Sequence, residues 1–199
     1  MWDLFANRFA VRVNPDGSAR AGPKPLAVLP GSFNPLHHGH TALARAAAAR
    51  LGLDVHFELS VVNADKPELP HAEVERRVAQ FVEAGPVWVT RAATFEKKAD
   101  LFPSAAFVLG WDTAVRVIDP KYYGGPLGRD AALRKLRARG CRLVVGGRID
   151  GRGMFRVWGG AELVADEFAA LFVALAEEDF RVDVSSTELR IERKPAAPQ

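Results

Sequence analysis

The sequence predicts an α/β protein: a single domain built on a doubly wound parallel sheet with helices on both faces. Short apolar runs alternate with helical patterns along most of the chain from Pro25 onward. Such alternation of strands and helices is typical of a Rossmann-like sheet. The chain has 199 residues, of which 48% are hydrophobic, and this length supports one core of ordinary size better than two small ones.

The first half of the domain contains three expected strands separated by two helices. The strands are short, apolar and bounded by Pro, Gly or polar residues, as buried strands are: Leu26–Pro30, His56–Val62 and Val87–Thr90. An Ala-rich helix follows His40 and ends at Gly52, a residue suited to a helix C-cap. The second helix, His71–Ala84, is followed by Gly85 and carries its apolar residues on one face: Val74, Val78, Phe81 and Val82.

The second half repeats the alternation. Apolar runs predict strands at Ala105–Gly110, Cys141–Gly146 and Phe180–Val184. One-sided patterns predict helices at Thr113–Ile118, Arg129–Arg139 and Glu162–Ala176, and a short one from Ser186. The basic side chains of the Arg129–Arg139 helix are most simply a solvated face: Arg134, Lys135, Arg137 and Arg139.

Three segments divide the chain. Residues 1–24 are expected to form an irregular or edge segment with a short hairpin around Asn14–Gly17. The domain itself covers residues 25–192, and the tail, residues 193–199, is expected to fray.

Composition narrows the classes of function. The net charge of +3 is too small to indicate a surface that wraps nucleic acid, and it does not repel a small anion. A single cysteine, Cys141, fits a reducing cytoplasm and excludes an internal disulfide framework. No apolar run has the length of a membrane span, and the broken N-terminus does not resemble a secretory signal. We therefore expect a cytoplasmic protein without membrane or nucleic-acid partners.

The loop after the first strand of the domain, Gly31–His40, has the composition of a ligand site. In an open parallel sheet, ligands bind beyond the carboxyl ends of the strands, where a βα loop meets its helix. We expect Gly31 to adopt a conformation denied to other residues and Gly39 to let a ligand approach the helix start. Free N–H groups at a helix N-terminus favour phosphate, so the whole loop, Ser32 and Phe33 included, is expected to bind a nucleotide.

Three histidines crowd this loop: His37, His38 and His40. His37 and His40 lie three residues apart, so both can face one anion from an exposed first turn of the helix. Imidazoles donate hydrogen bonds to phosphate oxygens and, when protonated, add charge. The alternatives are a solvated cluster or a metal site, and zinc is disfavoured because Cys141 is distant in sequence and no carboxylate is near. The chain has neither the P-loop nor the G-x-G-x-x-G motif.

A second candidate clamp lies near the C-terminus. Ser185, Ser186 and Thr187 follow an expected strand and begin a short helix, where hydroxyls satisfy free N–H groups as an N-cap does. Arg190 lies three residues after Thr187 on the same side of that helix. Hydroxyls, N–H groups and a guanidinium can therefore converge on one polyphosphate, although capping alone also accounts for the three hydroxyls.

Three motifs carry a resemblance to a known family. GSFNPLHHGH resembles the G-x-F-x-P-x-H-x-G-H signature of the nucleotidyltransferase superfamily, which includes the nicotinamide and nicotinate mononucleotide adenylyltransferases. VLGWD resembles its central G-x-D, and VSSTELR resembles its C-terminal I-S-S-T-x-I-R. The motifs occur in the family's order. The segments SVVNADKPEL and LVVGGR are similar to a cytidylyltransferase-like branch of the same superfamily.

The resemblance implies roles for further residues. Ser186, Thr187 and Arg190 would hold the ATP phosphates opposite His37 and His40. Gly110 and Asp112 would face a nucleotide ribose, although Asp112 is equally well explained as a helix N-cap. The remaining assignments are to the base or the acceptor. Arg148 would lie near the base, or it is a surface residue of a Gly-rich turn; Lys66 would lie in the acceptor loop, or it is a solvated lysine in a Pro-rich turn. Trp111 departs from the small residue of the adenylyltransferases and either stacks on a base or packs. We also consider Lys97, Lys98, Lys121, Tyr122 and Tyr123 for the acceptor site.

The expected reaction is nucleotidyl transfer from ATP to a phosphate monoester, with nicotinamide or nicotinate mononucleotide as the expected acceptor. The attacking phosphate has a second pKa of about 6 and needs no general base. His37, His40 and Arg190 are expected to stabilise the developing charge. Mg²⁺ is implied as a cofactor, bound mainly by the triphosphate and water, so no metal ligand is assigned to the protein.

Other functions stay open. A cytidylyltransferase would use CTP and a phosphorylated alcohol, and a regulator would bind nucleotide with little turnover. An aminoacyl-tRNA synthetase would need a K-M-S-K-S-like loop and an anticodon-binding region, and the sequence contains neither. The sequence names neither the acceptor nor the oligomeric state, and a homo-oligomer is compatible with it.

Overall fold

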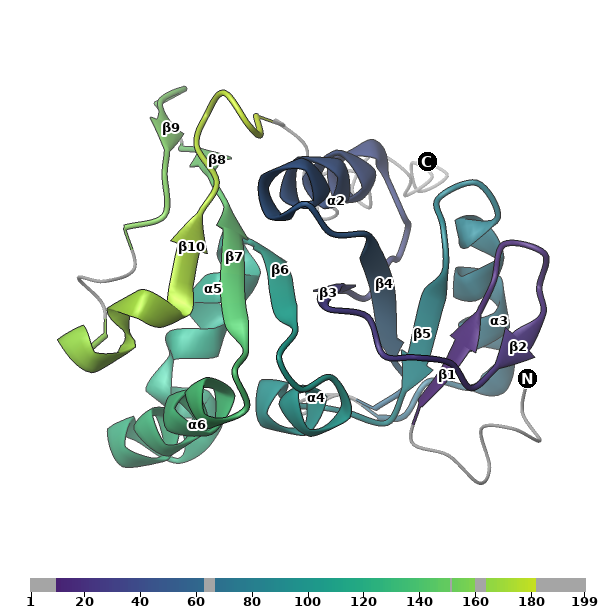
Figure 1. Cartoon of the computed structure of the whole chain (residues 1–199), viewed down its shortest axis with the longest axis horizontal. Helices are drawn as coiled ribbons and strands as arrows, with labels where there is room; N and C mark the ends of the chain where they lie inside the picture. The colour runs from purple at the N-terminus through teal and green to yellow at the C-terminus, as the bar shows by residue number, and fades with distance from the viewer. Residues whose placement is uncertain (1–9, 63–66, 151, 160–163, 182–199) are drawn as a thin grey trace, which may run out of the picture.

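The central feature of the molecule is one eight-stranded, mostly parallel sheet (Figure 1). The computed structural model describes residues 10–62, 67–150, 152–159 and 164–181. The parallel strands are β3 (Ala27–Pro30), β4 (Val55–Ser60), β5 (Val87–Thr90), β6 (Ala106–Gly110), β7 (Arg142–Gly146) and β10 (Phe172–Ala174). The predicted α/β fold is therefore confirmed.

Two antiparallel strands extend the sheet beyond β5. β1 (Ala10–Val13) pairs with β5 in the register Val11↔Val89, and it forms a hairpin with β2 (Ala19–Arg20). The turn between them, Asn14–Gly17, is closed by a hydrogen bond from the Gly17 N–H to the Asn14 carbonyl (2.9 Å), and Gly17 has φ 79°. The predicted hairpin around Asn14–Gly17 is confirmed, and the division of the chain at residue 25 stays a prediction.

Helices cover both faces of the sheet. The α-helices are α2 (His38–Leu51), α3 (His71–Val78), α4 (Phe95–Leu101), α5 (Trp111–Ile118) and α6 (Pro126–Ala138). Short 3₁₀ turns follow α3, α5 and precede β10: η1 (Ala79–Phe81), η2 (Pro120–Tyr123) and η4 (Asp166–Leu171). A separate two-stranded ribbon joins β8 (Arg148–Ile149) to β9 (Phe155–Arg156).

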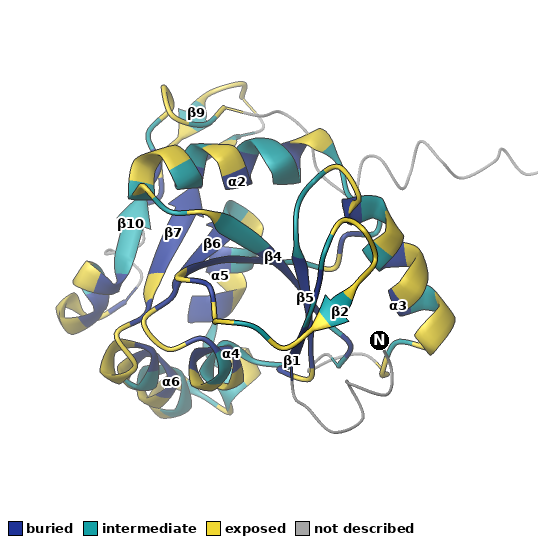
Figure 2. Ribbon diagram, turned by 45° about the vertical axis from the view of Figure 1, so that its right-hand side comes forward, coloured by how far each residue is buried: buried dark blue, intermediate teal, exposed yellow. Residues whose placement is uncertain are grey.

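Each face of the sheet has its own apolar core. On one face, side chains of β3, β4 and β5 pack against Leu43 and Ala47 of α2, Val74 of α3 and Phe81 of η1. On the other face, strand side chains pack against α4, α5, α6 and η4. Figure 2 shows the consequence: the strands in the middle are largely buried, and exposed residues lie on the outer sides of the helices. Burial from both sides explains why the strands read as continuous apolar runs instead of alternating ones.

The order of the strands creates a switch point between β3 and β6. The order is β10-β7-β6-β3-β4-β5-β1-β2, so the chain proceeds from β3 to β4 and β5 on one side and then crosses back to β6 on the other. Connections leave the adjacent strands β3 and β6 in opposite directions, which opens a crevice at their carboxyl ends. The loops that the sequence singles out follow these two strands and β7.

Two predictions about the C-terminal part are wrong. In place of a helix over Glu162–Ala176, the described residues form η4 and then β10, which pairs with β7 through Val173↔Val144. The apolar run from Phe168 suits either structure, and pairing with an open sheet edge decides it. Phe180 and Arg181 are not in a strand. Phe180 packs instead against the apolar core on the face of the sheet that α2 covers. The rest of the strand predicted at Phe180–Val184 lies outside the described residues.

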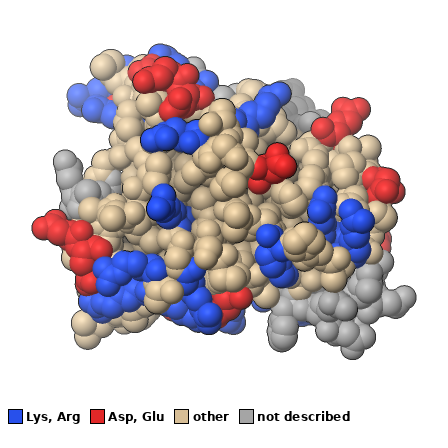
Figure 3. Space-filling view, viewed as in Figure 1, with Lys and Arg blue, Asp and Glu red and all other residues tan. Residues whose placement is uncertain are grey.

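The basic residues of α6 form a solvated, ion-paired face, as predicted. Lys and Arg gather at the lower left of Figure 3, where α6 lies, with carboxylates beside them. Lys135 and Arg139 both contact Asp100 (2.7 Å each), and Arg134 contacts Glu167 (2.7 Å). Pairs this exposed contribute little to stability. Among the helices of the described ranges, none is both long enough and apolar enough to cross a membrane.

Candidate functional site

The loop between β3 and α2 forms the centre of the candidate site. β3 ends at Pro30, and the Gly31 N–H then donates to the Glu58 carbonyl of β4 (2.9 Å). α2 begins at His38 with His37 as its N-cap residue, and it ends at Gly52 in the left-handed conformation, as predicted. The free N–H groups of a fourteen-residue helix therefore face the crevice at the carboxyl edge of the sheet.

Phe33 anchors this loop in the core. Its ring is fully buried, and it packs edge-on against Phe57 (5.7 Å) and Phe81 (5.0 Å). The prediction that Gly31 adopts a conformation denied to other residues is wrong. The residue of the loop with a positive φ is Phe33, at 44°. Gly31 is needed for a different cause: a Cβ added there would lie 2.7 Å from the Phe33 ring. Gly39 is buried in the first turn of α2.

His40 and His37 form a stack on this anchor. The His40 ring packs edge-on against Phe33 (5.1 Å), and the centroids of the two imidazoles are 3.8 Å apart. His40 Nδ1 accepts a hydrogen bond from the His37 N–H (3.3 Å). A neutral imidazole that accepts at Nδ1 carries its proton on Nε2. The contact therefore leaves the Nε2–H of His40 as a donor for a ligand.

Both imidazoles are neutral in the free protein at physiological pH. Burial and, to a smaller extent, the neighbouring His37 together lower the pKa of His40 from 6.5 to about 3. Burial likewise lowers the pKa of His37, with a smaller contribution from His38. The expectation that His40 lies at an exposed helix start is thus wrong. In this state the pair offers hydrogen-bond donors and no positive charge of its own.

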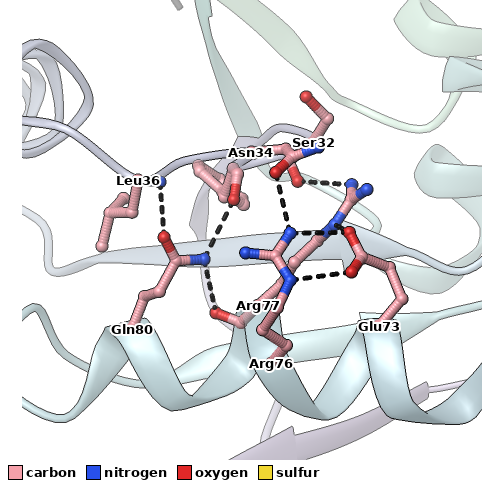
Figure 4. Close-up of polar contacts among 8 residues, drawn as sticks. Ser32, Asn34, Leu36, Glu73, Arg76, Arg77 and Gln80 are labelled. Atoms are coloured by element: carbon pink, nitrogen blue, oxygen red, sulfur yellow. Dashed lines mark hydrogen bonds and ion pairs between the residues drawn. The ribbon is translucent and has the colours of Figure 1, made fainter. Parts of the chain in front are cut away.

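Residues of α3 and η1 hold the loop from the other side, a contact that no sequence motif predicts. Gln80, in η1, accepts from the Leu36 N–H (2.9 Å) and donates to the Phe33 carbonyl (3.0 Å). Arg77 donates to the Ser32 carbonyl (2.8 Å) (Figure 4). Because Arg77 and Gln80 are more than forty positions from the loop in sequence, only their helical spacing of three could have hinted at a shared role.

Three further predicted site residues, Gly110, Asp112 and Arg148, meet at the same edge. Gly110 and Gly146 are register partners at the carboxyl ends of β6 and β7. Directly after them, Asp112 and Arg148 form an ion pair of 2.8 Å. Asp112 is not the N-cap of α5, because the cap is Gly110 and the helix starts at Trp111. The structure thus brings Asp112 and Arg148 together, with both side chains still open to solvent.

Trp111 packs instead of standing free. Its ring contacts Trp158 edge-on at 5.1 Å, and Trp158 in turn lies against Phe172 of β10. Trp111 remains partly exposed. The packing alternative is therefore confirmed for one side of the ring, and base stacking on the other side stays a prediction.

The candidates for the acceptor site mostly have structural partners. Lys98 is buried and contacts both carboxylate oxygens of Glu58 (2.8 and 2.7 Å), so its assignment to a ligand is wrong. The Tyr123 hydroxyl donates to the Val117 carbonyl (2.8 Å), and burial raises the pKa of this phenol to about 12. Lys121 pairs with Asp119 (2.8 Å). Lys97, which is exposed, and Tyr122 therefore stay as candidates for the acceptor site.

Several predicted residues lie outside the described residues: Lys66, Ser185, Ser186, Thr187 and Arg190. Their roles stay predictions. Within the described ranges, no three His, Cys, Asp or Glu side chains are grouped so that they could hold a metal ion.

An open cleft of about 770 Å³ adjoins the histidines. It runs along α2 toward Asp54, and its walls include His37 and His38 at one end and Arg45 and Arg12 further along. Leu36 of the loop and Gln80 of η1 also line this cleft.

The chain is similar to known nucleotide-handling proteins. Residues 28–192 match the cytidylyltransferase-like family. A Gloeobacter violaceus protein named as a nicotinate-nucleotide adenylyltransferase is 30% identical over 180 residues, which cover 83% of this chain and 82% of that protein. A Schizosaccharomyces pombe protein named as a nicotinamide mononucleotide adenylyltransferase is 31% identical over 115 residues. That match covers 50% of this chain and 45% of the S. pombe protein, less than half of its length.

Proposed function

Because this chain belongs to the cytidylyltransferase-like family, we propose that it is a nucleotidyltransferase that transfers AMP from ATP to the phosphate of a small acceptor. The observation that carries the proposal is the arrangement of His37 and His40 at the N-terminus of α2, beside the switch point of the sheet. The names of the two relatives support nicotinamide or nicotinate mononucleotide as the acceptor.

The reaction needs alignment more than proton transfer. An oxygen of the acceptor phosphate attacks the α-phosphorus of ATP, a new P–O bond forms, and the bond to the β-phosphate oxygen breaks to release pyrophosphate. With a second pKa of about 6, the attacking phosphate is already an anion at neutral pH. The protein must hold the two phosphates in line and stabilise the charge that develops on the bridging and non-bridging oxygens.

Neutral imidazoles suit this task. The Nε2–H of His40 is oriented by the Nδ1 contact with the His37 backbone, and it would donate to an oxygen of the triphosphate. The N–H groups of the first turn of α2 would add further donors. A donor fixed before the reaction loses no energy to reorganisation when charge develops.

The opposite side of the triphosphate would be held by Ser186, Thr187 and Arg190. The motif resemblance supports this assignment. Asp112 and Arg148 would lie near the nucleoside, the carboxylate accepting from ribose hydroxyls. Their ion pair at the carboxyl edge supports a shared site, because both groups are available to a ligand there.

Mg²⁺ would accompany ATP, bound mainly by phosphate oxygens and water. In this proposal the triphosphate and water, and not a cage of protein carboxylates, supply the ligands of the ion. The ion would neutralise charge on the triphosphate, and the protein's own residues would set its orientation.

Transfer of CMP from CTP is the second candidate, and the description of the matched family as cytidylyltransferase-like supports testing it. A screen for pyrophosphate release separates the two: ATP and CTP are each tested with nicotinamide mononucleotide, nicotinate mononucleotide, phosphopantetheine and glycerol phosphate. Turnover with ATP and a mononucleotide supports the proposal, and turnover with CTP and glycerol phosphate supports the alternative. Tight ATP binding without pyrophosphate release from any pair would overturn both and leave a nucleotide-binding regulator.

A further inference from the structure

A polar network from α3 and η1 determines the path of the first βα loop. Gln80 contacts the loop at two points, accepting from the Leu36 N–H (2.9 Å) and donating to the Phe33 carbonyl (3.0 Å). Arg77 donates to the Ser32 carbonyl (2.8 Å). Figure 4 shows both side chains pointing from the helix toward the loop. Two carbonyls and one N–H of an otherwise irregular segment are thus satisfied by one helical turn.

The network is itself braced. The Glu73 carboxylate accepts from Arg77 Nε and from Arg76 (2.7 Å each), and Arg76 also donates to the Asn34 side chain (2.8 Å). These hydrogen bonds lower the pKa of Glu73 to about 2, so the carboxylate is ionised at any pH at which an enzyme of this kind works. Arg77 is 8% exposed, and a charge-assisted hydrogen bond from a buried guanidinium is stronger than one between neutral groups.

These contacts bear on anion binding at the neighbouring helix start. The carbonyls of Ser32 and Phe33 carry partial negative charge, and they are taken up by donors on α3 and η1. They are therefore not free to turn toward an anion at the N-terminus of α2. The Leu36 N–H bond fixes the chain directly before His37, the residue that caps α2.

We propose that Gln80 and Arg77 are positioning residues that hold the loop Gly31–His37 in the conformation that receives the nucleotide phosphates. The inference rests on the proposed function for the identity of the ligand. Neither side chain touches substrate in this scheme: both act through the backbone of the loop and through the placement of His37 and His40.

The test compares Gln80→Met and Arg77→Lys with a control on the same helix. Methionine keeps the length of glutamine without its hydrogen bonds, and a lysine ammonium cannot reproduce the planar contacts of Arg77. Val78 packs against the core but makes none of these hydrogen bonds, so Val78→Ala loses stability through packing alone. The full-length variants are assayed for kcat, the KM of ATP and the KM of the acceptor, well below their melting temperatures.

We expect Gln80→Met to lower kcat/KM for ATP by about tenfold to a hundredfold, the effect of misplacing groups by a fraction of an ångström to an ångström. Arg77→Lys should give a smaller loss, and the acceptor KM should hardly change. Val78→Ala should match the wild type in all three constants. Variants of Gln80 and Arg77 that behave like Val78→Ala, with lower melting temperatures but unchanged constants, would overturn the inference.

Hydrogen exchange separates this inference from the proposed function. In the wild type the Leu36 amide should exchange slowly, and in Gln80→Met it should exchange faster. In Val78→Ala, which keeps the hydrogen bond to Gln80, the Leu36 amide should stay as protected as in the wild type. If the wild type turns over no nucleotide pair and binds no ATP, the proposed function fails. The exchange rate of the Leu36 amide then tests only whether Gln80 holds the loop. Equal exchange rates in the wild type and in Gln80→Met would show that Gln80 does not hold it.

Discussion

His40 Nδ1 accepts a hydrogen bond from the His37 N–H at 3.3 Å, and this contact determines what His40 can do. It assigns the proton of the neutral ring to Nε2. The edge-on packing on Phe33 and the stacking with His37 hold the ring in one orientation. His40 is thus part of the fold and has an Nε2–H left for a ligand, so we expect a substitution there to change both stability and activity.

Replacing His40 should strongly impair turnover. His40→Asn removes the oriented Nε2–H, and kcat should fall by about a hundredfold or more, as for loss of one preorganised donor. The control is His38→Asn. His38 lies in the same turn but does not accept the hydrogen bond from the His37 N–H, so this variant should retain most of the activity. Steady-state rates of pyrophosphate release measure both. Equal rates for the two variants would show that His40 has no special role in turnover.

Stability should depend on pH through His40. Its pKa is about 3 when folded and 6.5 when unfolded, so below pH 6.5 the unfolded state binds a proton that the folded state does not. The contribution of the neutral ring is therefore complete above pH 6.5 and declines as the pH falls toward 3. Urea unfolding is measured at about pH 7.5, 6.5, 5.5 and 4.5, which spans the ordinary range of histidine pKa values. The free energy of unfolding should fall more steeply with decreasing pH for the wild type than for His40→Asn. Parallel curves would contradict a partly buried His40 that stays neutral in the folded protein.

The buried ion pair between Glu58 and Lys98 should be important for stability and not for binding. Lys98→Met leaves the Glu58 carboxylate, which is 0% exposed, without its cation, and this should cost about 3–5 kcal/mol. Thr90, which also donates to Glu58, cannot compensate a full charge. The double variant Glu58→Gln with Lys98→Met should recover part of the loss, because it removes the unpaired charge.

The matched control for this pair is its neighbour Lys97, which is exposed. Lys97→Met should change the free energy of unfolding by no more than about 0.5 kcal/mol. Urea denaturation of the four proteins measures the comparison. Similar losses at positions 97 and 98 would show that the pair is not the source of the stability.

Arg190 provides a test of the second phosphate clamp, which stays a prediction. A guanidinium can make a bidentate contact with the triphosphate that a single ammonium cannot copy. Arg190→Lys should therefore weaken ATP binding although the charge is kept, and Arg190→Ala should weaken it more. Isothermal titration of ATP into the three proteins measures the difference. Equal dissociation constants would remove the C-terminal residues from the site.

The local patterns of the sequence determined most elements of the fold. Buried parallel strands are continuous apolar runs, and helix ends such as Gly52 carry their own chemical signal, so these features need no knowledge of distant contacts. The glycines and histidines of the loop after β3 likewise indicated a candidate site by their composition. The match to a family over residues 28–192 agrees with the motifs quoted from the sequence.

The tertiary structure decided what depends on contacts between distant residues. The apolar residues of Phe172–Ala174 suit a strand or a helix, and pairing with the edge of β7 decides for the strand. Lys98 reads as a solvated or ligand-binding lysine until Glu58, forty positions away, is seen beside it in the core. Gln80 and Arg77 read as ordinary helix residues until the loop is folded onto them. Hydrophobic period and capping chemistry are local, whereas burial, hydrogen-bond partners and the pKa of His40 arise only when separate elements pack together.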